Sequence, residues 1–250
     1  MIVIHVDSME DTARLKKAYA GLEHVKLLYN PSKEEVIGQL ERDDDPLVMC
    51  LGHGTTGGLF AANWMGYVVD RDVINLLKDR KMVGIWCYAS SFAEHYGLQG
   101  YFTSMFISNW DEAYCMGFPD NTNKDILNEV DLFCEKINAF LKEGVPMERW
   151  VGLWQAGCHK EKDFVRFNYE GMRWFTNSKE QYTQAALQAD PYAQCDLKGS
   201  EGALNQTNPT QLLRKPVDSS LNFSNSSCRR TTLAGYIMTQ LFAINPCDGL

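Results

Sequence analysis

The first 110 residues alternate between strand-like and helix-like segments, and this alternation narrows the folds open to the chain. Short apolar runs bounded by turn residues, which are typical of buried strands, occur at residues 2–6, 24–29, 46–54 and 82–89. Ser32 with Glu35 forms a helix-capping pair ahead of an apolar stripe in the second intervening segment. Strand and helix in this order favour right-handed crossovers and a helix-covered, mostly parallel sheet. We therefore predict an α/β three-layer sandwich.

Other segments carry weaker signals. Ser8 with Asp11 predicts a cap for a helix that ends near Gly21. Helical spacing of apolar residues predicts a long helix over 122–144 and a short one over 149–155. The remaining predictions are a fifth strand over 101–107, a β-hairpin or loop over 57–69, and a sixth strand or aromatic loop over 164–175.

The sequence changes character near residue 189. Residues 190–250 hold five acidic and five basic residues, so the net charge of −8 arises upstream of them. We predict one domain over residues 1–188 and a C-terminal tail over 189–250 whose pattern predicts no fold. The tail is either a flexible extension or a segment foreign to the fold, such as an out-of-frame read-through.

Composition argues against several functional classes. The chain is acidic and has no cluster of Lys and Arg, which disfavours nucleic acid as a partner. Apolar stretches fall short of the roughly 20 residues that cross a bilayer. The N-terminus, residues 1–7, resembles a first strand more than a signal peptide, so we expect a cytoplasmic protein without disulfides. The eight cysteines include no Cys-x-x-Cys pair, so we expect no metal and no organic cofactor.

Two apolar runs end in residues of complementary chemistry. The first run leads to His53 and the second to Cys87. If these runs are neighbouring parallel strands, the imidazole and the thiol meet at the carboxyl edge of the sheet, where open α/β sheets place ligands. A thiol beside an imidazole can be deprotonated to a nucleophile. The pair predicts a cysteine-dependent hydrolase that acts on peptide bonds.

The motifs Leu51-Gly52-His53-Gly54 and Gly84-Ile85-Trp86-Cys87 resemble those of the caspase-like superfamily of cysteine peptidases, which includes caspases, metacaspases, separases, gingipains and CHAT-domain proteases. The resemblance covers roughly residues 1–115, and the chain would be a compact member. It departs from the family pattern at Trp86, where Ala, Ser or Gly is more usual, and at Tyr88, which is bulkier than usual.

The resemblance implies a role for each matched residue. Cys87 would be the nucleophile of a thioester-forming endopeptidase, and His53 would polarise the thiol or protonate the leaving amine. The backbone amides of Gly54 and Cys87 would bind the oxyanion. Asp7, which follows the first strand, would favour a basic P1 side chain in a protein or peptide substrate. The sequence does not predict the oligomeric state or a need for proteolytic activation.

Two other interpretations remain open at this stage. One is an inactive caspase-like scaffold or partner-binding module, because Trp86 and Tyr88 could crowd the thiol. Residues 52–57 also fit the Gly-x-Gly-x-x-Gly pattern of dinucleotide-binding folds, which requires a helix to open at the third glycine. Asp70 or Asp72 could orient His53, although each is more simply a helix cap.

Overall fold

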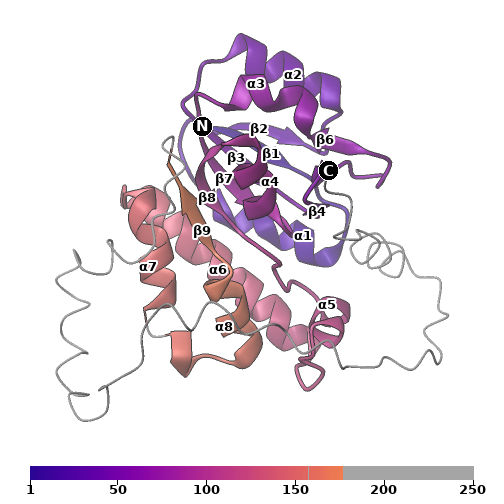
Figure 1. The fold of residues 1–250 in the computed structure, drawn as a ribbon, viewed down its shortest axis with the longest axis vertical. Coiled ribbons are helices and arrows are strands. Elements are labelled where there is room, and N and C mark those ends of the chain that lie inside the picture. Colours follow the sequence, from indigo (N-terminus) through magenta and orange to yellow (C-terminus); the bar gives the residue numbers. More distant parts are fainter. Residues whose placement is uncertain (157, 177–250) are drawn as a thin grey trace, which may run out of the picture. The chain divides into compact units, whose positions relative to one another are not determined.

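The computed structural model describes residues 1–156 and 158–176, so the predicted tail over 189–250 lies outside the described residues. Its centre is a six-stranded sheet in the order β2-β1-β3-β7-β8-β9 (Figure 1). These strands are β1 (Ile2–His5), β2 (Lys26–Tyr29), β3 (Leu47–Leu51), β7 (Lys81–Ile85), β8 (Gln99–Phe102) and β9 (Arg173–Phe175). All neighbours pair in parallel except β8 and β9. The predicted α/β fold with a mostly parallel central sheet is confirmed.

A small antiparallel sheet forms from the segment predicted as a hairpin or loop. Its strands are β4 (Gly54–Thr55), β5 (Gly58–Phe60) and β6 (Tyr67–Val69). It starts directly after His53, so the first of the two motifs leads from the central sheet into this hairpin.

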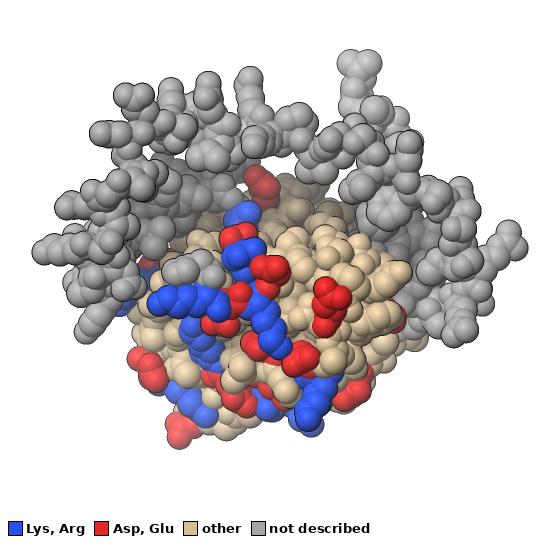
Figure 2. Space-filling model, turned by 90° about the horizontal axis from the view of Figure 1, so that it is seen from below, with Lys and Arg blue, Asp and Glu red and all other residues tan. Residues whose placement is uncertain are grey.

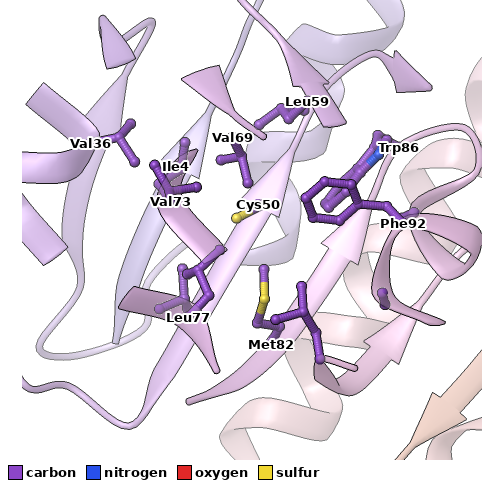
Figure 3. Close-up of a cluster of buried hydrophobic side chains, with 14 of the residues drawn as sticks. Ile4, Val36, Cys50, Leu59, Val69, Val73, Leu77, Met82, Trp86 and Phe92 are labelled. Carbon is purple, nitrogen blue, oxygen red and sulfur yellow. The ribbon is translucent and has the colours of Figure 1, made fainter. Parts of the chain in front are cut away.

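One face of the central sheet is covered by helices from the first half of the chain. These are α2 (Lys33–Arg42), η2 (Arg71–Val73, a 3₁₀ turn), α3 (Ile74–Leu77) and α4 (Ala89–Tyr96). Figure 3 shows side chains of this layer meeting side chains of the sheet, with Val36 and Phe92 from the helices and Ile4, Cys50 and Met82 from the strands. Removing such apolar surface from water is the main stabilising contribution to the fold.

Helices from both ends of the described chain cover the opposite face. They are α1 (Glu10–Arg14), η1 (Leu15–Ala18), α6 (Asn123–Lys142), η3 (Met147–Arg149) and α7 (Trp150–Gln155). A third, smaller cluster joins α5 (Trp110–Cys115), α6 and α8 (Asp163–Glu170). A last 3₁₀ turn, η4, spans Cys158–Lys160. The two helical layers and the sheet match the expected sandwich.

The longest helix begins and ends as its sequence predicts. Thr122 Oγ1 accepts a hydrogen bond from the Asp125 backbone at 3.1 Å, and the Asp125 carboxylate accepts one from the Thr122 backbone. This reciprocal capping opens α6, and Gly144 follows its end with a φ of +65°.

Three predicted elements differ from the structure. The Ser8 cap is wrong, because Met9 is the first residue of the capping turn and Thr12 Oγ1 accepts from the Ser8 and Met9 backbones. The fifth strand ends at Phe102 rather than residue 107. The segment 164–175 is mostly helix α8, followed by β9 at the sheet edge, where the antiparallel pairing needs only a short aromatic strand.

Charged side chains of both signs interleave on the face of the molecule shown in Figure 2. Ion pairs also link the first helical turns to α6, where Arg14 lies 2.6 Å from Asp131 and Lys17 lies 2.8 Å from Glu135. The Lys17–Glu135 pair is largely exposed, and an exposed pair stabilises a fold by about 0–1 kcal/mol, so the apolar layers are the larger contribution.

Candidate active site

His53 and Cys87 lie side by side at the carboxyl edge of the sheet. Strands β3 and β7 pair in parallel with Leu51 opposite Ile85, and each site residue follows two positions after one of these. Because strand side chains alternate, a step of two residues returns to the same face. Both side chains line one cavity of about 10 Å³. The structure therefore brings the predicted imidazole and thiol together.

The Asp11 carboxylate binds Nε2 of the His53 imidazole. His53 Nε2 lies 3.2 Å from one Asp11 carboxylate oxygen and 3.4 Å from the other. Asp11 comes from the first turn of α1, and His5 fixes this turn. The His5 Nε2–H donates to the Thr12 carbonyl at 2.8 Å, and its Nδ1 accepts from the Tyr19 hydroxyl at 2.8 Å. His5 therefore has a structural role, and Asp11 replaces Asp70 and Asp72 as the group that orients His53.

The two partners stabilise each other's charge. Burial alone disfavours the charged form of both groups, but the hydrogen bond and the opposite charge outweigh it. The pKa of His53 is raised above its ordinary value of 6.5, although burial lowers it, because Asp11 and the charge of Glu112 favour the imidazolium. The pKa of Asp11 is held well below its ordinary value, although burial raises it, by His53 and by hydrogen bonds from Ser108 and Asn109.

Glu112 joins the imidazole to the thiol. One carboxylate oxygen, Oε1, lies 3.9 Å from His53 Nδ1 and 3.8 Å from Cys87 Sγ. The other, Oε2, accepts from the Ser108 backbone N–H at 2.8 Å and lies 3.0 Å from the Ser108 hydroxyl oxygen. Among the described residues, His53 and Cys87 form no direct hydrogen bond, and this glutamate contacts both. Burial raises the pKa of Glu112, and the nearby charge of His53 partly opposes this.

The Cys87 thiol is buried and is not part of a disulfide. The thiol donates a hydrogen bond to the Phe106 carbonyl, with 3.5 Å between Sγ and the carbonyl oxygen. Burial, and then the charge of Glu112, raise the pKa of Cys87 well above its ordinary value.

Trp86 is one of the residues that line the cavity beside the thiol. It is buried with the α4 layer, and Figure 3 shows it beside Phe92, while its Nε1–H donates to the Thr55 carbonyl at 3.2 Å. A Cβ at Gly54 would lie 2.2 Å from the Trp86 ring and 2.4 Å from the Gly58 carbonyl. The glycine is therefore required for packing against Trp86, a reason that the motif alone did not reveal.

The backbone N–H groups of Gly54 and Cys87 have no hydrogen-bond acceptor among the residues that the structure describes. The Phe60 N–H donates to the His53 carbonyl, and Gly54 pairs with Leu59 in the next register position. Antiparallel pairs alternate between bonded and non-bonded positions, so the Gly54 N–H faces away from β5. The Cys87 N–H donates to no acceptor within residues 1–156 and 158–176. These are the two amides expected to bind an oxyanion.

The Trp64 side chain packs on the His53 imidazole. The Trp64 ring stacks on His53 with centroids 5.2 Å apart and planes at 30°. Trp64 lies in the β5–β6 connection with a φ of +61°, a left-handed conformation that is unusual for a bulky residue. Strained backbone of this kind gathers at functional sites.

Asp7 lies at the same sheet edge but outside the cavity that His53 and Cys87 line. Its carboxylate accepts a hydrogen bond from the Tyr29 hydroxyl, and its N–H donates to the Asn30 side chain at 2.7 Å. Its predicted part in substrate recognition stays a prediction.

The other two motif interpretations have clear structural outcomes. Asp70 is a helix cap, because its side chain accepts from the Asp72 backbone at the start of η2 and pairs with Lys33 at 2.5 Å. The dinucleotide-binding interpretation is wrong for residues 52–57, because Gly57 lies in the β4–β5 turn and a strand, not a helix, follows it. A pyrophosphate would meet no helix N-terminus there.

Sequence reasoning missed Asp11 and Glu112 as site residues. The sequence pattern explains Asp11 as part of a helix cap. An acid so close to the end of the first strand can also reach the carboxyl edge of the sheet. Glu112 carries no local signal, because it comes from the connection after β8 and reaches the site only through the tertiary fold.

Other features of the described residues limit what the site can hold. No cluster of three or more His, Cys, Asp or Glu side chains in residues 1–156 and 158–176 has the geometry of a metal site. None of the helices in this part of the chain is long and apolar enough to span a membrane.

No family model matches the chain, and no curated protein is significantly similar to it in sequence.

Proposed function

We propose that this protein is a caspase-like cysteine endopeptidase that uses Cys87, His53 and Asp11. The observation that supports this most strongly is the shared cavity at adjacent strand ends, where the Asp11 carboxylate binds one nitrogen of His53. The other nitrogen lies 3.9 Å from the same Glu112 oxygen that lies 3.8 Å from the sulfur. A thiol is activated for nucleophilic catalysis by an adjacent base, and a third group orients that base.

The reaction follows from these positions. The Cys87 proton passes to His53 Nδ1, and the thiolate attacks the carbonyl carbon of a peptide bond. The oxygen becomes an oxyanion that the Gly54 and Cys87 N–H groups bind, and one such donor contributes roughly 3 kcal/mol to transition-state stabilisation. The imidazolium then protonates the leaving amine as the C–N bond breaks. Water, deprotonated by His53, hydrolyses the thioester and releases the acid.

Asp11 acts through His53 as a positioning residue. By accepting the Nε2–H it keeps Nδ1 directed toward the sulfur and stabilises the imidazolium formed during attack. Asp7 remains our candidate for recognition of a basic P1 side chain. We propose a cytoplasmic location, since a reducing compartment keeps thiols such as Cys87 in their reduced form.

Cleavage of a peptide library, followed by mass spectrometry, tests this function. We expect cleavage that is lost in Cys87→Ala and falls by about 10²-fold or more in His53→Ala, since general acid–base catalysis contributes that much. His95→Ala is the matched control, because His95 is exposed on α4 and activity should be unchanged. Preference for Arg and Lys over Ala at P1 would support the Asp7 assignment.

Two results would contradict the proposed function. One is cleavage that persists in Cys87→Ala. The other is the absence of Cys87-dependent cleavage from both the wild-type chain and Glu112→Ala, a variant that removes the carboxylate next to the thiol.

A further inference from the structure

We propose that helix α5 is an internal cover that keeps the active site closed, with the Glu112 carboxylate in the space that a substrate carbonyl would occupy. This inference rests on the proposed function. An attacking sulfur and the imidazole that serves it must both reach the reacting carbonyl group. In the structure the group that contacts both is Glu112 Oε1, at 3.8 Å from Cys87 Sγ and 3.9 Å from His53 Nδ1.

The site is closed to a peptide in this conformation. Cys87 is 6% exposed and His53 is 7% exposed. The cavity that they line measures about 10 Å³, whereas a single water needs roughly 10–15 Å³. A peptide can therefore reach the sulfur only after part of the surrounding chain has moved.

Polar contacts fasten α5 to the site. The Ser108 hydroxyl donates to Asp11 Oδ2 at 2.6 Å, and the Asn109 amide donates to the same oxygen at 3.0 Å. The Asn109 side chain also caps α5 by accepting from the Glu112 backbone at 3.0 Å. The cover is thus attached to Asp11, the same acid that orients His53, and the Trp110 N–H also donates to Asn123 Oδ1 of α6 at 3.2 Å.

Apolar packing beneath α5 is slight, so the helix can detach without disrupting the main layers. It has six residues, of which Ala113 is the buried one. Ala113 belongs to the smallest apolar cluster, apart from the two large clusters on the sheet faces. Trp110 and Tyr114, which stack on each other, are 40% and 57% exposed. Elements with so few buried contacts open at low free-energy cost.

The base of the segment is fixed more firmly. Asn168 of α8 accepts from the Ile107 N–H at 2.7 Å and donates to the Ile107 carbonyl at 2.9 Å, both buried. Movement would therefore begin after Ile107, at Ser108 and Asn109, whose side chains hold the cover in place.

Departure of Glu112 would change the chemistry of the thiol as well as its exposure. A carboxylate beside a thiol disfavours the thiolate, whereas an imidazolium favours it. With Glu112 removed, one of the two carboxylates that raise the pKa of Cys87 would be gone, Asp11 being the other, and the uncovered thiol would ionise more readily. One movement therefore admits the substrate and activates the nucleophile.

The rate of Cys87 alkylation by iodoacetamide, resolved by mass spectrometry on the full chain, tests the cover directly. Glu112→Ala should alkylate at least about tenfold faster than wild type, because it both uncovers the sulfur and removes a charge that opposes the reactive thiolate. Glu112→Gln, which keeps the volume but not the charge, should fall between the two. Asp111→Ala, on the same helix but outside the cavity that Cys87 lines, is the control and should match wild type.

A second variant guards against misfolding of the first. Asn109→Ala removes the helix cap and the bond to Asp11 but leaves Glu112 in place, and it should also accelerate alkylation. Wild-type rates in both Glu112→Ala and Asn109→Ala, or wild-type alkylation as fast as a free thiol, would overturn the cover.

Peptide cleavage by the same variants separates this inference from the proposed function. Faster alkylation without any peptide cleavage would support the cover and refute the peptidase. Cleavage by Glu112→Ala at an unchanged alkylation rate would support the peptidase and refute the cover.

Discussion

The buried pair of Asp11 and His53 makes the stability of the fold depend on pH. The folded state raises the pKa of His53 above 6.5, so between 6.5 and the folded value it holds a proton that the unfolded chain has lost. The stabilisation is therefore complete below pH 6.5 and is lost as pH rises through the folded pKa. The contribution of Asp11 depends on pH in the opposite direction, because its folded pKa is lowered. Its stabilisation is lost as pH falls below 3.8, the ordinary pKa of an aspartate.

Asp11→Asn should remove most of this dependence, because it takes away the charge that favours the imidazolium while keeping the shape of the side chain. We expect the pKa of His53 to fall, and the decline in the free energy of unfolding above pH 6.5 to flatten. Urea unfolding across pH and an NMR titration of the imidazole measure the two effects. Asp7→Asn is the control, and an equal change there would contradict the assignment of Asp11.

Single residues also show how far sequence alone predicts the site. His53 and Cys87 could be found because each directly follows an apolar run, and parallel strands align such ends. Asp11 lies in a local pattern that two structures can explain, a cap or an inward-facing acid. Glu112 could not be found, because its position depends on how the connection after β8 folds back over the sheet.

The β4–β5 hairpin provides a prediction about an element. A Cβ at Gly54 would lie 2.2 Å from the buried Trp86 ring, and overpacking of this kind costs about 1–3 kcal/mol. Gly54→Ala should lower stability by that amount and displace the N–H that we assign to the oxyanion. Gly152 in α7 has open space around its Cβ position, so Gly152→Ala should stabilise by about 0.5–1 kcal/mol through helix propensity. Urea denaturation of both variants checks the contrast, and equal effects would disprove it.

Elements with a regular period were the most predictable. Helix α6 and the strands β1, β3 and β7 follow from apolar spacing and caps that point to the same structure. The structure of segment 164–175 does not follow from its spacing, because its aromatic residues suit both the buried face of α8 and the edge strand β9. Local composition cannot separate the two, and packing against α7 and β8 decides.

The layered architecture connects the site to the core beneath it. The Phe106 carbonyl accepts the Cys87 Sγ–H, and the Phe106 ring packs on Phe133 of α6 at 4.8 Å between centroids. Phe133 in turn contacts Trp154 of α7 at 5.0 Å. The position of the thiol therefore depends on the helical layer below the sheet as well as on the strand that carries it.

Two adjacent residues of α6 test how much that layer contributes. Phe133 is 1% exposed and its neighbour Leu132 is 56% exposed. Phe133→Ala should cost about 3–5 kcal/mol, because it leaves a cavity between α6, α7 and the sheet. This is a large share of the 5–15 kcal/mol that typically stabilises a domain, so the variant should unfold at much lower urea concentration. Leu132→Ala should stay within about 0.5 kcal/mol of wild type. Similar midpoints for the two variants would mean that the α6 layer does not support the sheet, and that the thiol is held by its strand alone.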